Sequence, residues 1–507
     1  MSNKEKNSES FRDSIGTLTK EGKRNWIFAQ KPSGLYHKAR AVVATILLAF
    51  LFAGPFITIN GHPLLQLKVL ERKFTILGMV FWPSDFYILV LAALTLLLFV
   101  IVFTAIFGRI WCGWACPQTI FMEMVFRKIE YWIEGDASAQ KRLNREPWSA
   151  KKIFKKVSKH GIFYAVSFII ANTFLAYIIG KDELFKIMSD PVSAHLTGFI
   201  IINLFSLTFY GVFSRFREQV CQFACPYGRY QSVMIDEDSI AVTYDFERGE
   251  PRGNPKKLKR SLLKKKNKAE ESVSNAGNHG VSVADIAQSG KIDSSEIPEL
   301  GDCIDCYQCV KVCPAGIDIR NGIQMECIQC TACMDACDNV MDKIDKPRGL
   351  IRYSSWNGIL NHDKKIRFTP RVMAYTIVLL ILATLFTGLL FSRSDTQSII
   401  LRAPGVLYQQ LPNGNYTNIY NLKLINKTFD EKKIALKLLS PDQGSITVIG
   451  KLEPVPPQEI REGRFFVALP KSVMKPELTQ IVVGVYTDGK LSDKIQSSFI
   501  GPDKLNP

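Results

Sequence analysis

Five long apolar runs constrain the fold of this chain more than any other feature of its sequence. They cover residues 41–59, 86–107, 162–179, 196–213 and 372–391. A membrane-spanning helix needs about 20 apolar residues, and in hydrocarbon every backbone N–H and C=O requires an internal partner, so each run is predicted to be a helix. One such run could instead be a buried core helix. Five of them with basic flanks predict an integral membrane protein, and so a lipid partner.

The basic residues predict the orientation. Lys and Arg cluster in the first 40 residues, after the second run and after the fourth run, whereas the loops at 60–85 and 180–195 carry few. By the positive-inside rule, the N-terminus is predicted in the cytoplasm and the C-terminus outside. The net charge of +17 therefore indicates a membrane surface and not nucleic acid. The polar first 40 residues are too long for the n-region of a signal peptide, so the first run is predicted to be an uncleaved anchor.

Two tandem cysteine quartets carry the strongest chemical signal. Each has the spacing Cys-x-x-Cys-x-x-Cys-x-x-x-Cys, which suits a [4Fe–4S] cluster whose fourth ligand comes from the other quartet. The sequence therefore predicts one cluster on Cys303, Cys306, Cys309 and Cys337 and a second on Cys327, Cys330, Cys333 and Cys313. A pair of zinc sites also uses cysteine quartets, but tandem repetition at this spacing favours iron–sulfur. These cysteines indicate thiolates in a reducing compartment rather than disulfides.

Two further motifs, Cys-x-x-x-Cys-Pro, follow the second and fourth apolar runs. They contain the cysteines Cys112, Cys116, Cys221 and Cys225. On a helix, residues four apart share a face, so both sulfurs of a pair are expected to point at one ligand. Duplicated hairpins would bring both pairs to the same membrane face. The four thiols are predicted to be catalytic metal ligands. They could hold Cu(I) or a further cluster, or they could form two redox disulfides. Buried structural cysteine is the alternative.

The remaining segments complete the predicted domain organisation. Residues 246–300 are basic and polar, which predicts a linker. Residues 395–507 contain segments of alternating or β-branched residues and the turn signal Asp488-Gly489, which predict an Ig-like β-sandwich. The predicted order is an N-terminal tail 1–40, a four-helix transmembrane region 41–235, the linker 246–300, a ferredoxin-like domain 301–345, a fifth helix 372–392 and the Ig-like domain 395–507.

Three polar side chains near the membrane are also candidates for a functional role. His62 and His195 both fall on the predicted outer side, where they are candidate haem or copper ligands, although ordinary interfacial histidines are favoured. Glu123 is interpreted as a solvated carboxylate in preference to a proton relay. The chain contains no glycine-rich phosphate loop or dinucleotide fingerprint, so NAD or flavin binding is not expected.

The sequence resembles the FixG/RdxA/CcoG family of cytochrome c oxidase accessory proteins. The matching stretches include Arg24-Asn-Trp-Ile, Gly34-Leu-Tyr-His, Trp111-Cys-Gly-Trp-Ala-Cys-Pro, Gln222-Phe-Ala-Cys-Pro-Tyr-Gly-Arg and Cys313-Pro-Ala-Gly-Ile-Asp-Ile-Arg. The resemblance implies a protein of the bacterial inner membrane, with cytoplasmic clusters and a periplasmic Ig-like domain. It also implies a role in cbb-type oxidase assembly, with reduction of Cu(II) to Cu(I). The implied partners are the oxidase, its copper-assembly factors, and a copper-delivery protein or transporter.

Three functions are compatible with these features. The first is a cupric reductase, favoured by the paired thiols. The second is an electron-transfer subunit that oxidises quinol or feeds a partner, favoured by the ferredoxin-like segment. The third is an assembly scaffold with structural clusters, for which the Ig-like domain is the only support. Composition and spacing do not by themselves indicate copper.

Overall fold

The computed structural model describes residues 23–59, 62–69, 71–254, 300–362, 369–405, 407–412, 414–475 and 478–502, apart from the Ser232 side chain. Most of the predicted linker and the first part of the N-terminal tail therefore lie outside the described residues. Five helices are long and apolar enough to cross a membrane: Leu35–Phe56, Pro83–Phe107, Ala150–Ile179, Val192–Phe216 and Pro370–Phe391. Four of the predicted runs lie wholly within one of these helices, and the first run, 41–59, continues three residues past the helix end at Phe56, where Thr58–Ile59 is a strand. The third helix starts twelve residues before its apolar run, because the basic segment that precedes the run is also helical.

The chain divides into two compact units. Unit 1 comprises residues 1–53, 96–174 and 187–379, and unit 2 comprises 54–95, 175–186 and 380–507. Four helices contribute residues to both units: α3 Phe86–Phe107, α8 Ala150–Ile179, α9 Lys181–Ser189 and α18 Pro370–Phe391. The other helices of unit 1 up to residue 249 are α2 Leu35–Ala53, α4 Ile110–Trp114, α5 Pro117–Ile120, η3 Phe121–Phe126, α6 Arg127–Ile133, α7 Ala137–Arg145, η4 Val192–His195, α10 Leu196–Gly211, η5 Val212–Phe216, η6 Val220–Ala224, α11 Pro226–Met234 and α12 Phe246–Gly249.

Three of these elements are π-helices. They are η3, η5 and η6, and they lie directly after the first Cys-x-x-x-Cys-Pro motif or around the second. A π-helical turn is rare and often marks a functional site. Between η3 and η5, aromatic rings fill the core: Phe126 stacks on Phe213 at 4.7 Å between ring centroids and meets Phe163 edge-on.

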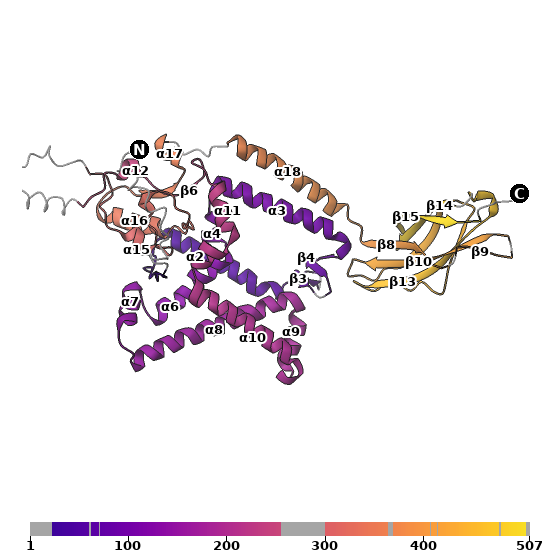
Figure 1. Cartoon of the computed structure of the whole chain (residues 1–507), viewed down its shortest axis with the longest axis horizontal. Coiled ribbons are helices and arrows are strands. Elements are labelled where there is room, and N and C mark those ends of the chain that lie inside the picture. Colours follow the sequence, from indigo (N-terminus) through magenta and orange to yellow (C-terminus); the bar gives the residue numbers. More distant parts are fainter. Residues whose placement is uncertain are drawn as a thin grey trace, which may run out of the picture. The chain divides into compact units, whose positions relative to one another are not determined.

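The cysteine quartets fold into a small domain within unit 1. Its elements are α15 Gln308–Val312, η8 Ile319–Asn321, α16 Ala332–Lys343 and α17 Trp356–Leu360, with the antiparallel pair β6 Ala241–Tyr244 and β7 Ile351–Ser354. Figure 1 shows α15, α16, β6 and α17 gathered together. Strand β6 precedes the linker and β7 follows the cysteines, so the domain begins well before residue 301. Its core includes Val242, Ile317, Met334 and Met341.

Unit 2 contains a two-sheet β-sandwich. One sheet has the order β12-β13-β10-β8, with β9 also pairing with β10, and the other has the order β11-β14-β15. The strands are β8 Thr396–Arg402, β9 Gln409–Gln410, β10 Tyr416–Asn426, β11 Ile434–Ser440, β12 Ser445–Val448, β13 Ile460–Leu469, β14 Leu478–Thr487 and β15 Lys490–Ile500. Strands β8, β10 and β13 lie side by side in Figure 1. Fully buried Tyr420, Phe465 and Phe499 contribute to the core between the sheets.

The turn predicted at Asp488-Gly489 joins β14 to β15, and both residues have positive φ (50° and 83°). Those values are what a two-residue hairpin turn requires. Strands β8 and β15 were not predicted, because each needs a neighbouring strand to bury its alternating face.

A second, smaller sheet belongs to unit 2. It consists of β3 Leu65–Lys68, β4 Lys73–Ile76 and β5 Met79–Phe81. Asp85, 2% exposed, lies just beyond it and pairs with Lys427 Nζ at 2.5 Å and Arg393 Nη2 at 2.8 Å. Val80 and Trp82 pack against Ile425 of the sandwich. These contacts join the small sheet to the sandwich. The short pair β1 Thr58–Ile59 and β2 His62–Pro63 completes the described strands of this unit.

Candidate functional site

The two cysteine quartets adopt the same backbone conformation twice. Asp305 and Tyr307, on either side of Cys306, have positive φ, and so do Gln329 and Thr331 at the matching positions around Cys330. A helix then begins in each repeat, α15 after Tyr307 and α16 after Thr331. Positive φ is uncommon for residues other than glycine. Its recurrence at matched positions identifies a duplicated loop that turns its cysteines inward.

Two cavities collect these cysteines. The first is lined by Cys303, Cys306, Cys309 and Cys337, and the second by Cys313, Cys327, Cys330 and Cys333 together with Cys309. In both cavities the fourth cysteine comes from the other repeat, as the sequence assignment requires. Apolar side chains such as Met341, Leu350 and Ile351 form much of the remaining wall of the first cavity.

The chemistry of this donor set fits iron–sulfur clusters. Burial raises the pKa of Cys309 and Cys337 to about 12 and that of Cys327 to about 11. Buried thiols of this kind lose their protons only when a cation replaces them, and a bound metal deprotonates a thiol outright. Among the described residues, no three Cys, His, Asp or Glu side chains are close enough to share a single metal ion. A cubane spreads its four ligands over four irons, so wider spacing of the sulfurs suits it better than a mononuclear zinc site.

The Cys-x-x-x-Cys-Pro pairs differ from the prediction in one respect. Helix α4 ends at Trp114 and η6 ends at Ala224, and the second cysteine of each pair is extended, with ψ of 125° at Cys116 and 112° at Cys225. The expectation that each pair shares one helical face is therefore wrong. The reason is the proline that follows each pair, which disfavours the α conformation in the preceding residue and starts a new helix.

The four cysteines nevertheless lie close enough to influence one another electrostatically. The charge of Cys116 and of Cys225 acts on both Cys112 and Cys221, and burial raises the pKa of Cys112 to about 11 and that of Cys221 to about 12. The amide of Gln231, fully buried, donates a hydrogen bond to Cys112 Sγ at 3.3 Å. These four cysteines, called the thiol group below, are half-buried, and no three of their sulfurs, among the residues described, share one mononuclear site.

The thiol group lies directly against the second cluster cavity. Gly113, between the paired cysteines, is so close to the loop of the second quartet that a Cβ placed on it would lie 2.5 Å from Ile328 O and 2.7 Å from Gln329 O. Trp114 Nε1 donates to the Tyr353 hydroxyl at 3.0 Å. The first Cys-x-x-x-Cys-Pro motif and the Cys327–Cys330 loop are therefore in backbone contact.

Two buried arginines hold this junction. Arg109 donates to the carbonyl oxygens of Met325 and Gly228, and so links the cluster loop to the helix after the second motif. Arg40 donates through Nε to Gly113 O at 2.6 Å. Both side chains join segments that are remote in sequence, and both are less than 9% exposed.

Family models match three parts of the chain. A model described as a 4Fe–4S dicluster domain matches residues 216–284 and 275–356, and a 4Fe–4S binding domain matches residues 89–136. An Ig-like fold found at the C-terminal end of FixG matches residues 386–502. These matches assign 4Fe–4S domains and an Ig-like domain to the chain.

Curated relatives match most of the chain. Protein RdxA of Cereibacter sphaeroides is 32% identical over 433 residues, which are 82% of this chain and 82% of that protein. The nitrogen fixation protein FixG of Rhizobium meliloti is 31% identical over 502 residues, covering 89% and 87%. Protein RdxB of Cereibacter sphaeroides is 30% identical over 483 residues, covering 90% and 91%.

The chain belongs to the FixG/RdxA family. As a member of that family it is a membrane protein with iron–sulfur domains and an Ig-like C-terminal domain. The 4Fe–4S binding model covers the first Cys-x-x-x-Cys-Pro motif, and the dicluster model begins before the second, so both motifs lie inside regions of iron–sulfur type.

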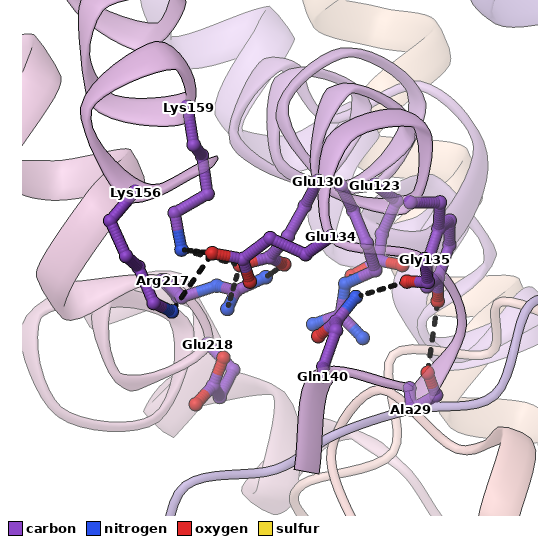
Figure 2. A network of polar contacts seen from close by, with 12 residues as sticks. Ala29, Glu123, Glu130, Glu134, Gly135, Gln140, Lys156, Lys159, Arg217 and Glu218 are labelled. Carbon is purple, nitrogen blue, oxygen red and sulfur yellow. Dashed lines mark hydrogen bonds and ion pairs between the residues drawn. The ribbon is translucent and has the colours of Figure 1, made fainter. Parts of the chain in front are cut away.

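This FixG-family protein buries a network of charges beside the thiol group (Figure 2). Glu130 pairs with Arg217 Nη2 at 2.8 Å and with Lys159 Nζ at 3.5 Å, and Glu134 pairs with Lys159 at 2.9 Å and Lys156 at 2.8 Å. Burial alone would raise the pKa of Glu130, but the neighbouring cations hold it below its usual value. The network ties α6, α8 and the segment after η5 together.

Glu123 belongs to the same region, and its interpretation as a solvated carboxylate is wrong. Its side chain is only 8% exposed, and Arg127 Nε lies 3.2 Å from its Oε1. The geometry of this ion pair is not that of a hydrogen bond, so Glu123 Oε1 and Arg127 Nε both lack a hydrogen-bond partner among the described residues. The Glu123 carboxylate is buried because η3 packs between α2 and α10. The sequence around Glu123 does not reveal this packing.

The two histidines have separate partners. The His62 ring stacks on Phe429 with 3.6 Å between centroids, and His195 Nε2 lies 2.9 Å from Asp190. A haem or copper role for them stays a prediction.

Sequence reasoning missed four residues of the site: Arg40, Arg109, Gln231 and Tyr353. The one available signal was a charged residue at the edge of an apolar run, which applies to Arg40 and Arg109. Nothing local distinguishes Gln231 or Tyr353, since their roles depend on which segments meet.

Proposed function

We propose that this protein is a membrane-bound iron–sulfur oxidoreductase that reduces Cu(II) to Cu(I) during maturation of the copper centre of a cbb-type cytochrome oxidase. The observation that supports this most directly is the contact between the thiol group and the Cys327–Cys330 loop through Gly113. Electron transfer between two centres needs a short path, and this contact provides one. Copper is the substrate in this proposal, and its recipient is the oxidase or a copper-assembly or delivery partner.

The cluster ligands are proposed as the sequence assigns them. Cys303, Cys306, Cys309 and Cys337 hold one [4Fe–4S] cluster, and Cys313, Cys327, Cys330 and Cys333 hold the other. When bound, such clusters supply one-electron chemistry. The protein's own part is to bury the thiolates, exclude water with apolar walls, and fix the distance to the thiol group through Arg109 and Arg40.

The thiol group then determines what is reduced. Thiolate sulfur is a soft ligand that prefers Cu(I). A site built from Cys112, Cys116, Cys221 and Cys225 therefore makes Cu(II) easier to reduce, because the product binds better than the reactant. Since no three of these sulfurs share one mononuclear site among the described residues, two thiolates per copper ion is the arrangement that fits. Each Cu(II) takes up one electron, so no hydride cofactor is needed.

The predicted orientation places this chemistry at the cytoplasmic face of a bacterial inner membrane, with the Ig-like domain in the periplasm. The support is the distribution of Lys and Arg between the loops. The Ig-like domain is then available to a periplasmic partner.

The experiment uses the anaerobically purified full chain. Dithionite reduces the protein, excess dithionite is removed, Cu(II) is added, and Cu(I) is followed with a chromogenic chelator while electron paramagnetic resonance reports cluster oxidation. We expect the double variant Cys116→Ala and Cys225→Ala to keep its cluster signals and lose Cu(I) formation. Cys306→Ser is the converse variant, which should lose one cluster signal. A double variant that reduces Cu(II) at the wild-type rate would rule out the copper site and leave a quinol-linked electron carrier as the better proposal.

A third cluster on the thiol group is the second candidate. One support is the match of the 4Fe–4S binding family model to residues 89–136. The other is that, among the described residues, no three of these sulfurs are close enough to bind a single metal ion. Iron analysis separates the two: two cubanes contain about eight irons per chain and three contain about twelve. An assembly scaffold with structural clusters would instead reduce no copper at all.

A further inference from the structure

A cavity beside the thiol group has no role in the function proposed above. Its volume is about 580 Å³, within the range of small-molecule sites. One wall comes from the start of α2 and the segment before it, with His37 and Arg40, and the other from η3 and α6, with Glu123, Lys128 and Trp132. All of these residues belong to unit 1.

The cavity lies at the N-terminal end of a helix that is long and apolar enough to cross a membrane. The helix that contains His37 and Arg40 is the first membrane-crossing candidate, and both residues are within its first two turns. Trp132, 79% exposed, stands at the cavity. Tryptophan is enriched where hydrocarbon meets water. A lipid-soluble molecule can therefore reach the cavity from the membrane.

Two buried polar groups at this cavity lack hydrogen-bond partners among the described side chains, although Arg127 Nε lies 3.2 Å from the Glu123 carboxylate as an ion pair. Arg40 is 3% exposed, and its Nη2 has no acceptor although its Nε is bonded to Gly113 O. Glu123 Oε1 has no hydrogen-bond donor. A buried polar atom without a hydrogen bond is destabilising. A ligand that offers one acceptor and one donor would satisfy both.

These partners distinguish between ligand classes. An anion such as a phosphate headgroup would pair with Arg40 and Lys128, but it would also face the carboxylates of Glu123 and Asp136, which line the same cavity. A neutral ring with two hydroxyls avoids this repulsion: one hydroxyl oxygen accepts from Arg40, and the other hydroxyl donates to Glu123. The lining thus favours a neutral, amphipathic, oxygen-bearing ligand.

The cavity is also next to the second cysteine quartet. The backbone N–H groups of Tyr36 and His37 donate to the Asp335 carboxylate of α16 at 3.0 and 2.7 Å. Burial raises the pKa of the Cys330 thiol, and the charges of Arg40 and Glu123 act on the same thiol. A redox-active ligand in the cavity is therefore close to a predicted cluster ligand.

We propose that this cavity binds the headgroup of a membrane quinol, which is the electron donor of the protein. The inference rests on the proposed function, because that function supplies Cu(II) as the final electron acceptor. Oxidation of the quinol breaks two O–H bonds and yields a quinone, two electrons and two protons. The electrons reduce two Cu(II) to two Cu(I), one at a time. One proton is taken by Glu123 Oε1, the other by water, and both end in solution.

The test measures binding first, with the full chain in nanodiscs, reduced with dithionite under anoxia, and decylubiquinol as the probe. We expect saturable binding of one molecule per chain. Trp132→Ala should weaken it about tenfold through loss of an aromatic contact. Trp148→Ala is the matched control, because Trp148 is equally exposed (76%) and does not line the cavity. An anionic lipid should not compete with the probe, because the cavity carboxylates disfavour an anion, whereas a cavity built for an anionic headgroup would release the probe.

The second arm uses decylubiquinol and the oxidised, anaerobic protein, with cluster reduction followed by electron paramagnetic resonance. Trp132→Ala should slow reduction by quinol, and dithionite should reduce this variant and the wild type alike. The proposal is overturned by absent binding, by equal effects of Trp132→Ala and Trp148→Ala, or by displacement of the probe by an anionic lipid. Failure of dithionite-reduced protein to reduce Cu(II) would instead overturn the proposed function and leave quinol binding intact.

Discussion

Replacing Gly113 with alanine tests the contact on which the proposed function depends. A Cβ at this position would lie 2.5 Å from Ile328 O, whereas real Cβ contacts essentially never fall below 3.0 Å and are rarely tighter than 3.4 Å. The two segments must therefore separate by 0.5 Å (3.0 − 2.5) to 0.9 Å (3.4 − 2.5). The obstructing atoms belong to the backbone, so no side-chain rotation can relieve the contact.

The expected cost is that of overpacking, about 1–3 kcal/mol. Alanine is a better helix former than glycine by about 1 kcal/mol, which offsets part of this cost. Gly161→Ala is the matched control, because Gly161 lies within α8 and has no atom within 4 Å of an added Cβ. It gains the same helix propensity without the clash. The stability difference between the two variants, measured by thermal unfolding, isolates the cost of opening the contact.

The functional readout is Cu(II) reduction by the dithionite-reduced protein at equal cluster content. Gly113→Ala should be slower than Gly161→Ala, because the thiol group has moved away from the Cys327–Cys330 loop. Equal thermal stability and equal rates in the two variants would show that this contact neither stabilises the junction nor carries electrons, and the reasoning from Gly113 would be refuted.

Three further predictions concern the remaining parts of the chain. Asp85→Asn should destabilise unit 2 by about 3–5 kcal/mol, because it leaves Lys427 and Arg393 without their buried partner. Limited proteolysis measures this loss of stability. Asp430 is exposed, so the control variant Asp430→Asn should leave the stability unchanged. Hydrogen bonds from Lys433 N–H and Lys432 lower the pKa of Asp488, so its stabilisation should be complete above about pH 4 and should disappear as the pH falls through the folded-state pKa. The difference in thermal stability between wild type and Asp488→Asn should therefore shrink on acidification, and a pH-independent difference would contradict this. A reporter fused after Pro507 should be active outside the cytoplasm and one inserted at 270–290 should be active inside, and the reverse pattern would overturn the orientation.

Features that depend on local pattern could be predicted from the sequence. Apolar length alone predicts a membrane helix, because hydrocarbon permits few other structures. Each of the five runs overlaps a helix long enough to span, although the first run extends three residues beyond its helix. Cysteine spacing predicts the duplicated loops, because each loop is formed by neighbouring residues. The strand at residues 416–426 and the turn at Asp488-Gly489 follow from alternation and from turn chemistry.

Local sequence pattern was misleading in two situations. In one, an adjacent residue changes the backbone conformation, and in the other, a segment distant in sequence buries the side chain or pairs with the strand. The prolines after Cys116 and Cys225 break the helix that the spacing of each pair suggested. Glu123 looks like a surface carboxylate in sequence, but packing encloses it beside Arg127. Strands β8 and β15 depend on partners in other parts of the sandwich.

Only the tertiary structure decided which segments meet at the site. Gly113 contacts residues more than 200 positions away, and Arg40 joins α2 to the first cysteine motif beside that contact. The quinol cavity likewise exists only because the start of α2 lies against η3 and α6. The physical reason is that a sequence constrains each segment through its own backbone and its periodicity, whereas the pairing of remote segments depends on complementary shape, unpaired hydrogen-bonding groups and buried charge, none of which is defined until the chain has folded.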